Sequence, residues 1–333
     1  MGNNPPFVSV IIPCRNEEKY IEECLNSVIN QDYPKEKLEV LIVDGMSEDR
    51  TRAVLGKYTK KYSFVKILDN PKKFTPFAFN TGIKNSNGDS IIIMGAHCVY
   101  KKDYISKCVK YLKEYNVDNV GGIWKILPRE NTLVAKSITF ASSSIFGAGD
   151  AYYRRGYSKG PRLVDTVFGG CYRKEVFERI GLFNENLVRS QDMEFNLRLK
   201  KAGGKILLVP EIVSYYYPKS NLKDFFRHNF SDGIWSTYPL KFEVRIFSWR
   251  HLVPLFFVSS LILSLFFSFF FWQARLFFDL IFGSYVFLSL FFSVKISFKK
   301  GFQYLFLMPI VFATRHFGYG LGSIWGIVKL LRG

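Results

Sequence analysis

Two acidic residues at the start of a predicted helix are the side chains best placed for acid–base chemistry. Asp192 and Glu194 follow Ser190, and three basic residues occupy the last turn of the same helix. This charge order suits the helix dipole and makes Ser190 a candidate N-cap. Residues two apart on a helix point in different directions, so one acid can face a cleft while the other packs. We therefore take Asp192 as a candidate general base. The alternative is that both acids only stabilise the helix end.

Short apolar, β-branched runs alternate with helical patterns over the first 94 residues. We expect strands at residues 7–12, 38–43, 65–68 and 90–94, and helices at 19–29, 50–62 and 75–85. This order predicts an α/β fold with an open, mostly parallel, Rossmann-like sheet that binds ligands at the carboxyl ends of its strands. The sequence has no glycine-rich dinucleotide loop and no Walker pattern, which argues against dehydrogenases and common NTPases.

Polar segments follow three of these strands. They are residues 13–17, 44–49 and 95–97, which read PCRNE, DGMSED and GAH. Each segment alone could be a helix cap or an ordinary loop. Because the carboxyl ends of parallel strands share one edge of a sheet, the three together predict a ligand site.

The last third of the chain is apolar. Residues 251–272 contain no charged side chain, and residues 276–294 contain only Asp279. Both runs have the length of a bilayer span, so we expect membrane helices at about 251–273 and 276–294. A third apolar region, 302–328, contains Arg315, His316 and four glycines. It is either one helix with a small-residue packing face or two interfacial pieces. We expect a catalytic domain at 1–245 and a membrane domain at 246–333.

The net charge of +18 favours an anionic partner. Six basic residues lie between positions 219 and 250, next to the apolar region. No nucleic-acid-binding motif is present, so membrane lipid is the expected partner and nucleic acid is not. The basic cluster at 295–300 predicts a multi-pass protein of the cell membrane whose N-terminal domain faces the cytoplasm. Five cysteines without a Cys-x-x-Cys pair, and no signal peptide before residue 7, agree with a reducing compartment.

Several motifs together resemble glycosyltransferase family 2, the inverting nucleotide-sugar transferases of the GT-A fold. These are VSVIIPCRNE at 8–17, VDGMSEDRT at 43–51, NTG at 80–82, NGD at 87–89, VDTVFG at 164–169 and QDMEFNLR at 191–198. Within the family, the segments at 164–169 and 191–198 are most similar to the membrane-associated, succinoglycan-biosynthesis type of glucosyltransferase. The resemblance extends from about residue 8 to about residue 254.

The resemblance implies roles for residues of this chain. Asp192 is the base that deprotonates the acceptor hydroxyl, Asp44 hydrogen-bonds the nucleotide base, and Arg227 meets the departing diphosphate. From its position beside the apolar region, Arg227 could equally contact a lipid headgroup instead. The nucleotide and donor-sugar site is implied to include Pro13, Arg15, Glu17, Asn80, Gly95, Ala96, Gly169 and Gly170 as well.

One position departs from the family pattern. Related sequences have Asp-x-Asp or Asp-x-His where this chain has Gly95-Ala96-His97. His97 can still ligate Mn²⁺ or Mg²⁺, but hard divalent ions prefer carboxylate oxygen, which Gly95 does not supply. Either the diphosphate supplies most ligands with help from Asp89 or Asp192, or the activity is weak or independent of metal.

The resemblance implies an enzyme that moves a sugar, with inversion, from a nucleotide-diphosphate sugar to a hydroxyl of a polyprenyl-linked glycan in polysaccharide or glycoconjugate synthesis. Two alternatives remain open. One is a polyprenyl-phosphate monoglycosyl synthase, whose ionised acceptor needs no base. The other is a catalytically weak relative that only binds nucleotide sugar.

Overall fold

The computed structural model describes residues 4–149, 151–154, 159–244 and 249–332. The chain forms two compact units, each assembled from two segments of the sequence. Unit 1 contains Met1–Lys125 and Gly156–Tyr216, and unit 2 contains Ile126–Arg155 and Tyr217–Gly333. The expected domain boundary at residues 245 and 246 lies outside the described residues.

Unit 1 is built on one mixed β-sheet. The described strands are β1 (Val8–Cys14), β2 (Leu38–Asp44), β3 (Val65–Asp69), β4 (Ser90–Ile93), β5 (Cys98–Tyr100), β6 (Asn119–Ile126), β7 (Arg162–Leu163), β8 (Cys171–Arg173) and β9 (Ile206–Tyr216). They run in the order β3-β2-β1-β4-β8-β6-β9-β5, with β7 beside β9. The pairs among β1 to β4 are parallel, whereas β8 is antiparallel to β4 and β6, and β9 is antiparallel to β5 and β7. The α/β class is confirmed, but the expectation of a mostly parallel sheet is wrong beyond β4, because β8 enters the sheet from the opposite direction.

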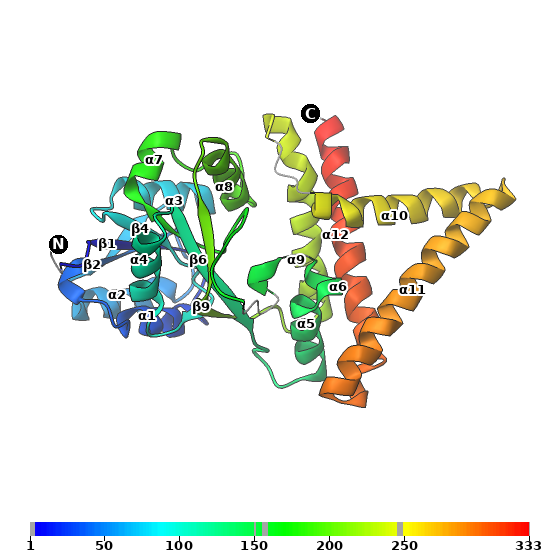
Figure 1. Ribbon diagram of the computed structural model, residues 1–333, viewed down its shortest axis with the longest axis horizontal. Helices are drawn as coiled ribbons and strands as arrows, with labels where there is room; N and C mark the ends of the chain where they lie inside the picture. Colours follow the sequence, from blue (N-terminus) through cyan, green and yellow to red (C-terminus); the bar gives the residue numbers. More distant parts are fainter. Residues whose placement is uncertain (1–3, 150, 155–158, 245–248, 333) are drawn as a thin grey trace. The chain divides into compact units, whose positions relative to one another are not determined.

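Helices α1 (Ile21–Ile29), α2 (Thr51–Lys61) and α3 (Thr75–Lys84) join the parallel strands β1 to β4, as expected. Unit 1 also contains α4 (Tyr104–Glu114), α7 (Lys174–Ile180) and α8 (Gln191–Lys201) (Figure 1). Strand β2 is buried at every position and β1 at all but one. Full burial on both faces explains why these strands appear in the sequence as continuous apolar runs rather than as alternating patterns.

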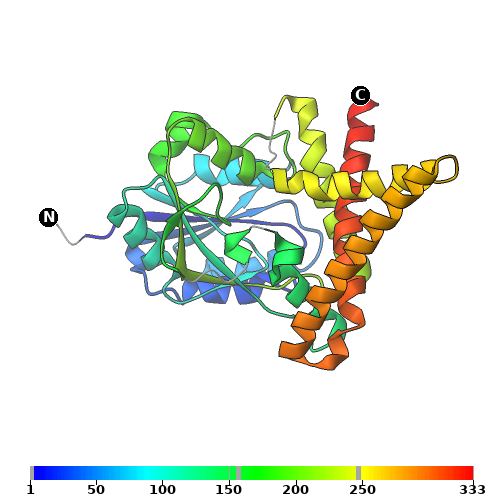
Figure 2. The ribbon, with the colours of Figure 1, turned by 45° about the vertical axis from the view of Figure 1, so that its right-hand side comes forward.

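Unit 2 is helical. Its helices are α5 (Leu133–Ser143), α6 (Ile145–Ala148), α9 (Leu222–Thr237), α10 (Trp249–Phe267), α11 (Trp272–Lys300) and α12 (Leu307–Leu331). Short 3₁₀ helices occur in unit 1 at Lys35–Lys37 and in unit 2 at Tyr152–Arg154, Tyr238–Phe242 and Phe302–Tyr304. Helices α10 and α11 meet at a sharp turn (Figure 2).

The third apolar region is mainly one long helix, α12, with a small-residue packing face. A Cβ at Gly322 would lie 2.0 Å from the carbonyl oxygen of Phe230 on α9, and one at Gly326 would lie 2.7 Å from that of Ile234. Both distances are far below van der Waals contact, so the backbones of α9 and α12 touch and only glycine fits there. Of the two readings left open by the sequence, the single helix is correct.

One helix in the described part of the chain is long and apolar enough to cross a bilayer, and it is α11. The apolar portion of α10, His251–Phe267, is shorter than that length. In the most apolar window of α11, 11% of residues are buried. Of the two spans expected from the sequence, only the one at about 276–294 therefore lies in a described helix that meets this length; the span expected at about 251–273 is not confirmed.

Candidate functional site

The carboxyl ends of four neighbouring strands meet at one edge of the sheet in unit 1. Residue Cys14 of β1 is paired in register with Asp44 of β2, and Asp44 with Asp69 of β3. Strand β4 ends beside Ile11 of β1, so Gly95 follows at the same edge. The structure thus brings together the three polar segments singled out in the sequence.

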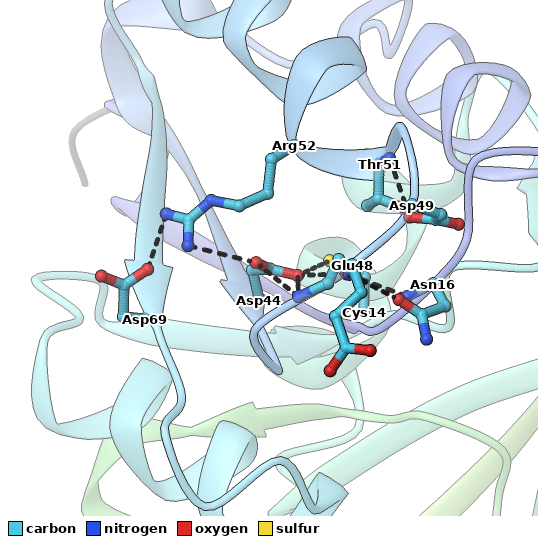
Figure 3. Close-up of polar contacts among 9 residues, drawn as sticks. Cys14, Asn16, Asp44, Glu48, Asp49, Thr51, Arg52 and Asp69 are labelled. Atoms are coloured by element: carbon cyan, nitrogen blue, oxygen red, sulfur yellow. Dashed lines mark hydrogen bonds and ion pairs between the residues drawn. The ribbon is translucent and has the colours of Figure 1, made fainter.

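Asp44 is fully buried at this edge and bonded within the protein. Its carboxylate accepts a hydrogen bond from the Ser47 hydroxyl at 2.5 Å and from the Ser47 backbone N–H at 3.2 Å. The Arg52 guanidinium lies 3.4 Å away, and Nη2 of the same guanidinium lies 2.7 Å from Asp69 (Figure 3). Burial, followed by the negative charge of Asp44, raises the pKa of the Cys14 thiol.

The loops after β1 and β2 are bonded to each other. The backbone N–H of Asn16 donates to the Ser47 hydroxyl at 2.9 Å, and the Asn16 amide oxygen accepts from the Glu48 N–H at 2.9 Å. Arg15 is exposed and lies 4.0 Å from Glu48. A cavity of about 440 Å³ lies beside this pair of loops and is lined by Met46, Ser47, Glu48, Arg52, Pro71 and Lys73.

Glu17 and His97 form a pair at the ends of β1 and β4. Nδ1 of His97 lies 2.8 Å from Oε2 of Glu17, and the Glu17 side chain is 13% exposed against 50% for His97. The backbone N–H of Glu17 is held by the Thr51 hydroxyl at 2.7 Å. A carboxylate at Nδ1 favours the proton on that nitrogen, which leaves Nε2 as the acceptor or ligand atom.

A divalent metal would not be held here by protein side chains alone. Among the described residues, no three His, Cys, Asp or Glu side chains gather to hold an ion. A Cβ at Gly95 would lie 3.3 Å from Cζ of Phe168, so an added side chain would crowd that ring. Asp89 precedes β4 and accepts a hydrogen bond from the Phe7 N–H at 3.0 Å, at the opposite edge of the sheet. The suggestion that Asp89 helps to hold the metal is therefore wrong.

Gly169 and Gly170 lie at the same edge, on the side of β4 that faces β8 rather than β1. The Ile93 N–H donates to the Gly170 carbonyl at 3.0 Å. Both glycines have positive φ, at 65° and 98°, and a Cβ on Gly169 would lie 2.4 Å from the Ile93 carbonyl oxygen. Glycine is therefore required at this turn, which precedes β8.

Asp192 and Glu194 play different structural parts, as their spacing predicts. Glu194 is buried and accepts from Nε of Arg198 at 2.7 Å. Asp192 is half-buried in the first turn of α8, where its negative charge is the second cause, after burial, of the raised pKa of Tyr172. Ser190 takes the N-cap position, but with φ at 60° its side chain makes no capping bond to a described residue, so the expectation of a serine cap is wrong.

A buried polar network lies one helical turn from Asp192. Asn196 is fully buried, and its amide oxygen accepts from Nδ2 of Asn119 at 3.0 Å and from the Tyr172 hydroxyl at 3.2 Å. Its own Nδ2 donates to the Thr166 hydroxyl at 3.0 Å. The network fastens α8 to β6, β8 and the segment before Gly169.

Two predicted donor-site residues have other partners. The amide of Asn80 donates to the Phe183 carbonyl at 2.9 Å and to Glu185 at 2.9 Å, and it accepts from the Phe183 N–H at 2.9 Å. Arg227 lies on α9 in unit 2, is exposed, and is 3.7 Å from Asp224. Their roles at the donor stay predictions, as do those of Pro13, which is half-buried in β1, and the buried Ala96.

Sequence reasoning missed Arg52, Lys73 and Asn196. Arg52 and Lys73 follow predicted strands but belong to no polar motif, and Asn196 stands inside a helix. For Asn196, a small amide on the same helix face as Asp192, four residues earlier, is a signal that could have found it.

Comparison with known proteins gives one consistent result. The family model described as Glycosyl transferase family 2 matches residues 9–181. A relative from Methanococcus voltae, named dolichyl N-acetyl-alpha-D-glucosaminyl phosphate 3-beta-D-2,3-diacetamido-2,3-dideoxy-beta-D-glucuronosyltransferase, is 40% identical over 236 residues, which are 68% of this chain and 72% of the relative. The succinoglycan biosynthesis protein ExoA of Rhizobium meliloti is 28% identical over 226 residues, 67% of each chain.

Solved structures show the same fold. The mannosyltransferase PcManGT from Pyrobaculum calidifontis, solved with GDP-Man and Mn²⁺, has a TM-score of 0.60 at 18% identity and covers 97% of this chain and 88% of its own. Residues 1–349 of TarS from S. aureus give a TM-score of 0.51 at 20% identity, covering 69% of this chain and 65% of those 349 residues. At these identities the likeness establishes a GT-A-like fold.

Proposed function

The chain belongs to glycosyl transferase family 2, and from this premise we propose that it transfers a sugar with inversion from a nucleotide-diphosphate sugar to a hydroxyl of a polyprenyl-linked glycan. The observation that carries the proposal is the arrangement along one sheet edge. The cavity lies at the end of β2, the Glu17–His97 pair at β1 and β4, and Gly169–Gly170 beside β4, at the start of β8.

The strand order supports an extended donor along this edge. Three strand spacings separate β2 from β8, which is about 14 Å at ~4.8 Å per spacing. A nucleotide base in the cavity would therefore direct its diphosphate past β1 and β4 and its sugar toward Gly169–Gly170.

Asp192 is the proposed general base. Its carboxylate takes the proton of the acceptor hydroxyl as the oxygen attacks the anomeric carbon. The bond from that carbon to the diphosphate breaks on the opposite face, and the electron pair leaves with the nucleoside diphosphate. A positioned base contributes about 10²- to 10⁴-fold to such a step. Arg227 is proposed to meet the departing diphosphate, with a lipid headgroup as its alternative partner.

The acceptor and the membrane assignment rest on relatives and on composition. The Methanococcus voltae relative is named for a dolichyl-linked sugar phosphate. Helix α11 exposes large aromatic side chains such as Phe287 at 68% and Phe298 at 74%, and it ends in Lys299 and Lys300. We propose a cytoplasmic catalytic domain at 1–245 and a multi-pass membrane domain at 246–333. Extraction of the full-length chain by carbonate without detergent would contradict the spanning arrangement.

The experiment uses membranes that contain the full-length chain, a polyprenyl-linked glycan, and UDP- and GDP-sugars labelled in the sugar. Wild type should transfer one label with inversion, as measured by NMR of the product anomeric centre. Asp192→Asn should lower the transfer rate by about 10²–10⁴ while nucleoside diphosphate affinity is unchanged. Glu178→Gln, which removes an exposed carboxylate on α7, is the matched control.

Two outcomes would contradict the proposal. Undiminished transfer to a bare polyprenyl phosphate by Asp192→Asn would favour the monoglycosyl synthase. Nucleotide-sugar binding with no transfer to either acceptor would favour the binding-only relative.

A further inference from the structure

The cavity at the ends of β2 and β3 contains a guanidinium whose role neither the family pattern nor the comparisons assign. We propose that Arg52 binds the nucleotide base and selects bases that carry a carbonyl oxygen, such as uracil or guanine, over adenine. The inference rests on the proposed function, because it concerns the nucleoside diphosphate part of the same donor. Arg52 is one of six residues that line the cavity of about 440 Å³.

Asp44, the residue expected to contact the base, is not accessible to it. Its side chain is 0% exposed. Oδ1 accepts from the Ser47 hydroxyl at 2.5 Å and the Cys14 thiol at 3.9 Å, and Oδ2 accepts from the Ser47 N–H at 3.2 Å. A base could bond this carboxylate only after the loop beyond β2 had opened. The structure gives Asp44 a different part, which is to hold Ser47 and Arg52.

Arg52 is held in place and still faces the cavity. Nη1 lies 3.4 Å from Oδ2 of Asp44, Nη2 lies 2.7 Å from Oδ1 of Asp69, and the side chain is 41% exposed (Figure 3). A guanidinium has five N–H donors in a rigid plane, so two carboxylate contacts fix its plane and leave donors for a ligand. The donor direction is thereby set before the nucleotide binds, which lowers the entropy cost of binding.

The charge of the Asp44–Arg52–Asp69 group favours a neutral base over a phosphate. The other two charged residues of the lining, Lys73 and Glu48, lie 3.5 Å apart and offset each other. One guanidinium stands between two carboxylates, so the Asp44–Arg52–Asp69 group carries a net negative charge when all three are ionised. A phosphate placed there would be repelled by both carboxylates, whereas a carbonyl oxygen can accept a hydrogen bond without bringing a charge.

The donor-only chemistry of arginine sets the selectivity. Uracil and guanine present a carbonyl oxygen at the position where adenine presents an amino group. A guanidinium can donate to the carbonyl, whereas an adenine whose amino group stood at the same position would present a second donor to it. Met46, which is 37% exposed, and Pro71 supply the apolar walls that the flat base would contact.

The test is calorimetric binding of UDP, GDP, ADP and inorganic pyrophosphate to the detergent-solubilised full-length chain. Wild type should bind UDP or GDP at least about tenfold more tightly than ADP. Arg52→Lys keeps the positive charge but loses the planar set of N–H donors of the guanidinium. It should weaken binding of the preferred nucleotide by about 10- to 100-fold, remove the preference over ADP, and leave pyrophosphate affinity unchanged.

The matched control is Arg179→Lys, in an exposed pair with Asp118 on unit 1, which should change none of the four affinities. Should Arg52→Lys not fold, Asp69→Asn replaces it, because the Asp69 side chain is 57% exposed. This substitution removes the charge of one of the two carboxylates that orient the Arg52 guanidinium, so the preference for the favoured nucleotide over ADP should fall several-fold.

Three results would overturn the assignment. Unchanged affinities and preference in a folded Arg52→Lys, or in Asp69→Asn if that variant is used, would show that Arg52 does not contact the base. A parallel loss of pyrophosphate affinity would place Arg52 at the diphosphate instead. If the wild type binds none of the nucleotides, the proposed function fails together with this inference, whereas the first two results leave the proposed function standing.

Discussion

Replacement of Asn196 by alanine should destabilise the protein and displace its candidate base. Asn196 is 0% exposed and makes three side-chain hydrogen bonds, to Asn119, Tyr172 and Thr166. The substitution leaves two buried donors, Nδ2 of Asn119 and the Tyr172 hydroxyl, without their acceptor. At about 1–3 kcal/mol for each unsatisfied group, we expect a loss of about 2–6 kcal/mol in the free energy of unfolding.

The loss should show as a lower midpoint of urea unfolding with an unchanged slope, measured by pulse proteolysis of the solubilised chain. Because the network fastens the helix that carries Asp192, the transfer rate should fall more than nucleoside diphosphate affinity. Lys200→Ala is the control on the same helix, since its ion pair with Asp165 is exposed and is worth under about 1 kcal/mol. A stability within about 0.5 kcal/mol of wild type, the range of ordinary surface changes, would refute the reasoning.

Three further predictions follow from other contacts. Gly95→Asp should not create Mn²⁺-dependent transfer and should cost about 1–3 kcal/mol, because its side chain meets Phe168; a metal titration of activity beside a thermal melt would reveal the opposite result. Gly322→Leu should abolish folded protein on size-exclusion chromatography, whereas Gly283→Leu on α11, where a Cβ would meet no described atom within 4 Å, should behave as wild type. None of the five buried thiols should react with iodoacetamide at pH 8 before denaturation, because the reagent cannot reach them and because burial raises the pKa of Cys98 to about 12. Labelling of the native chain, detected by mass spectrometry, would contradict their burial.

The alternation of strands and helices up to residue 94 could be predicted because fully buried strands and amphipathic helices leave simple patterns. Each predicted element lies within two residues of the observed one. The edge site was predictable for the same reason, since parallel strands bring their ends together. The pattern also predicted that Asp192 and Glu194 would separate, because helix geometry alone decides that.

Side-chain direction could not be predicted. The end of a strand gives the position of Asp44, but its burial depends on the path of the loop that brings Ser47 back to it. Asp89 belongs to a plausible motif and still lies at the wrong edge, because it precedes its strand. The room for a side chain at position 95 is limited by Phe168, which is 73 positions away in the sequence and is connected to Gly95 by no local pattern.

The glycine-lined contact between α9 and α12 has a consequence for synthesis. Helix α9 ends at Thr237 and α12 begins at Leu307, so α9 leaves the ribosome well before the helix it packs against exists. The interval between synthesis of a helix and synthesis of its packing partner is longer still for α5, which packs with Met308 and Phe312 of α12 in a common core. Contacts of such separation in sequence form slowly, because a long loop must close before they stabilise anything. A chain that ends after residue 245 keeps α5 and α9 but lacks α12. It would expose to solvent the backbone of α9 that Gly322 and Gly326 cover, and the apolar face of α5. A soluble catalytic fragment therefore needs these faces redesigned rather than a simple stop codon.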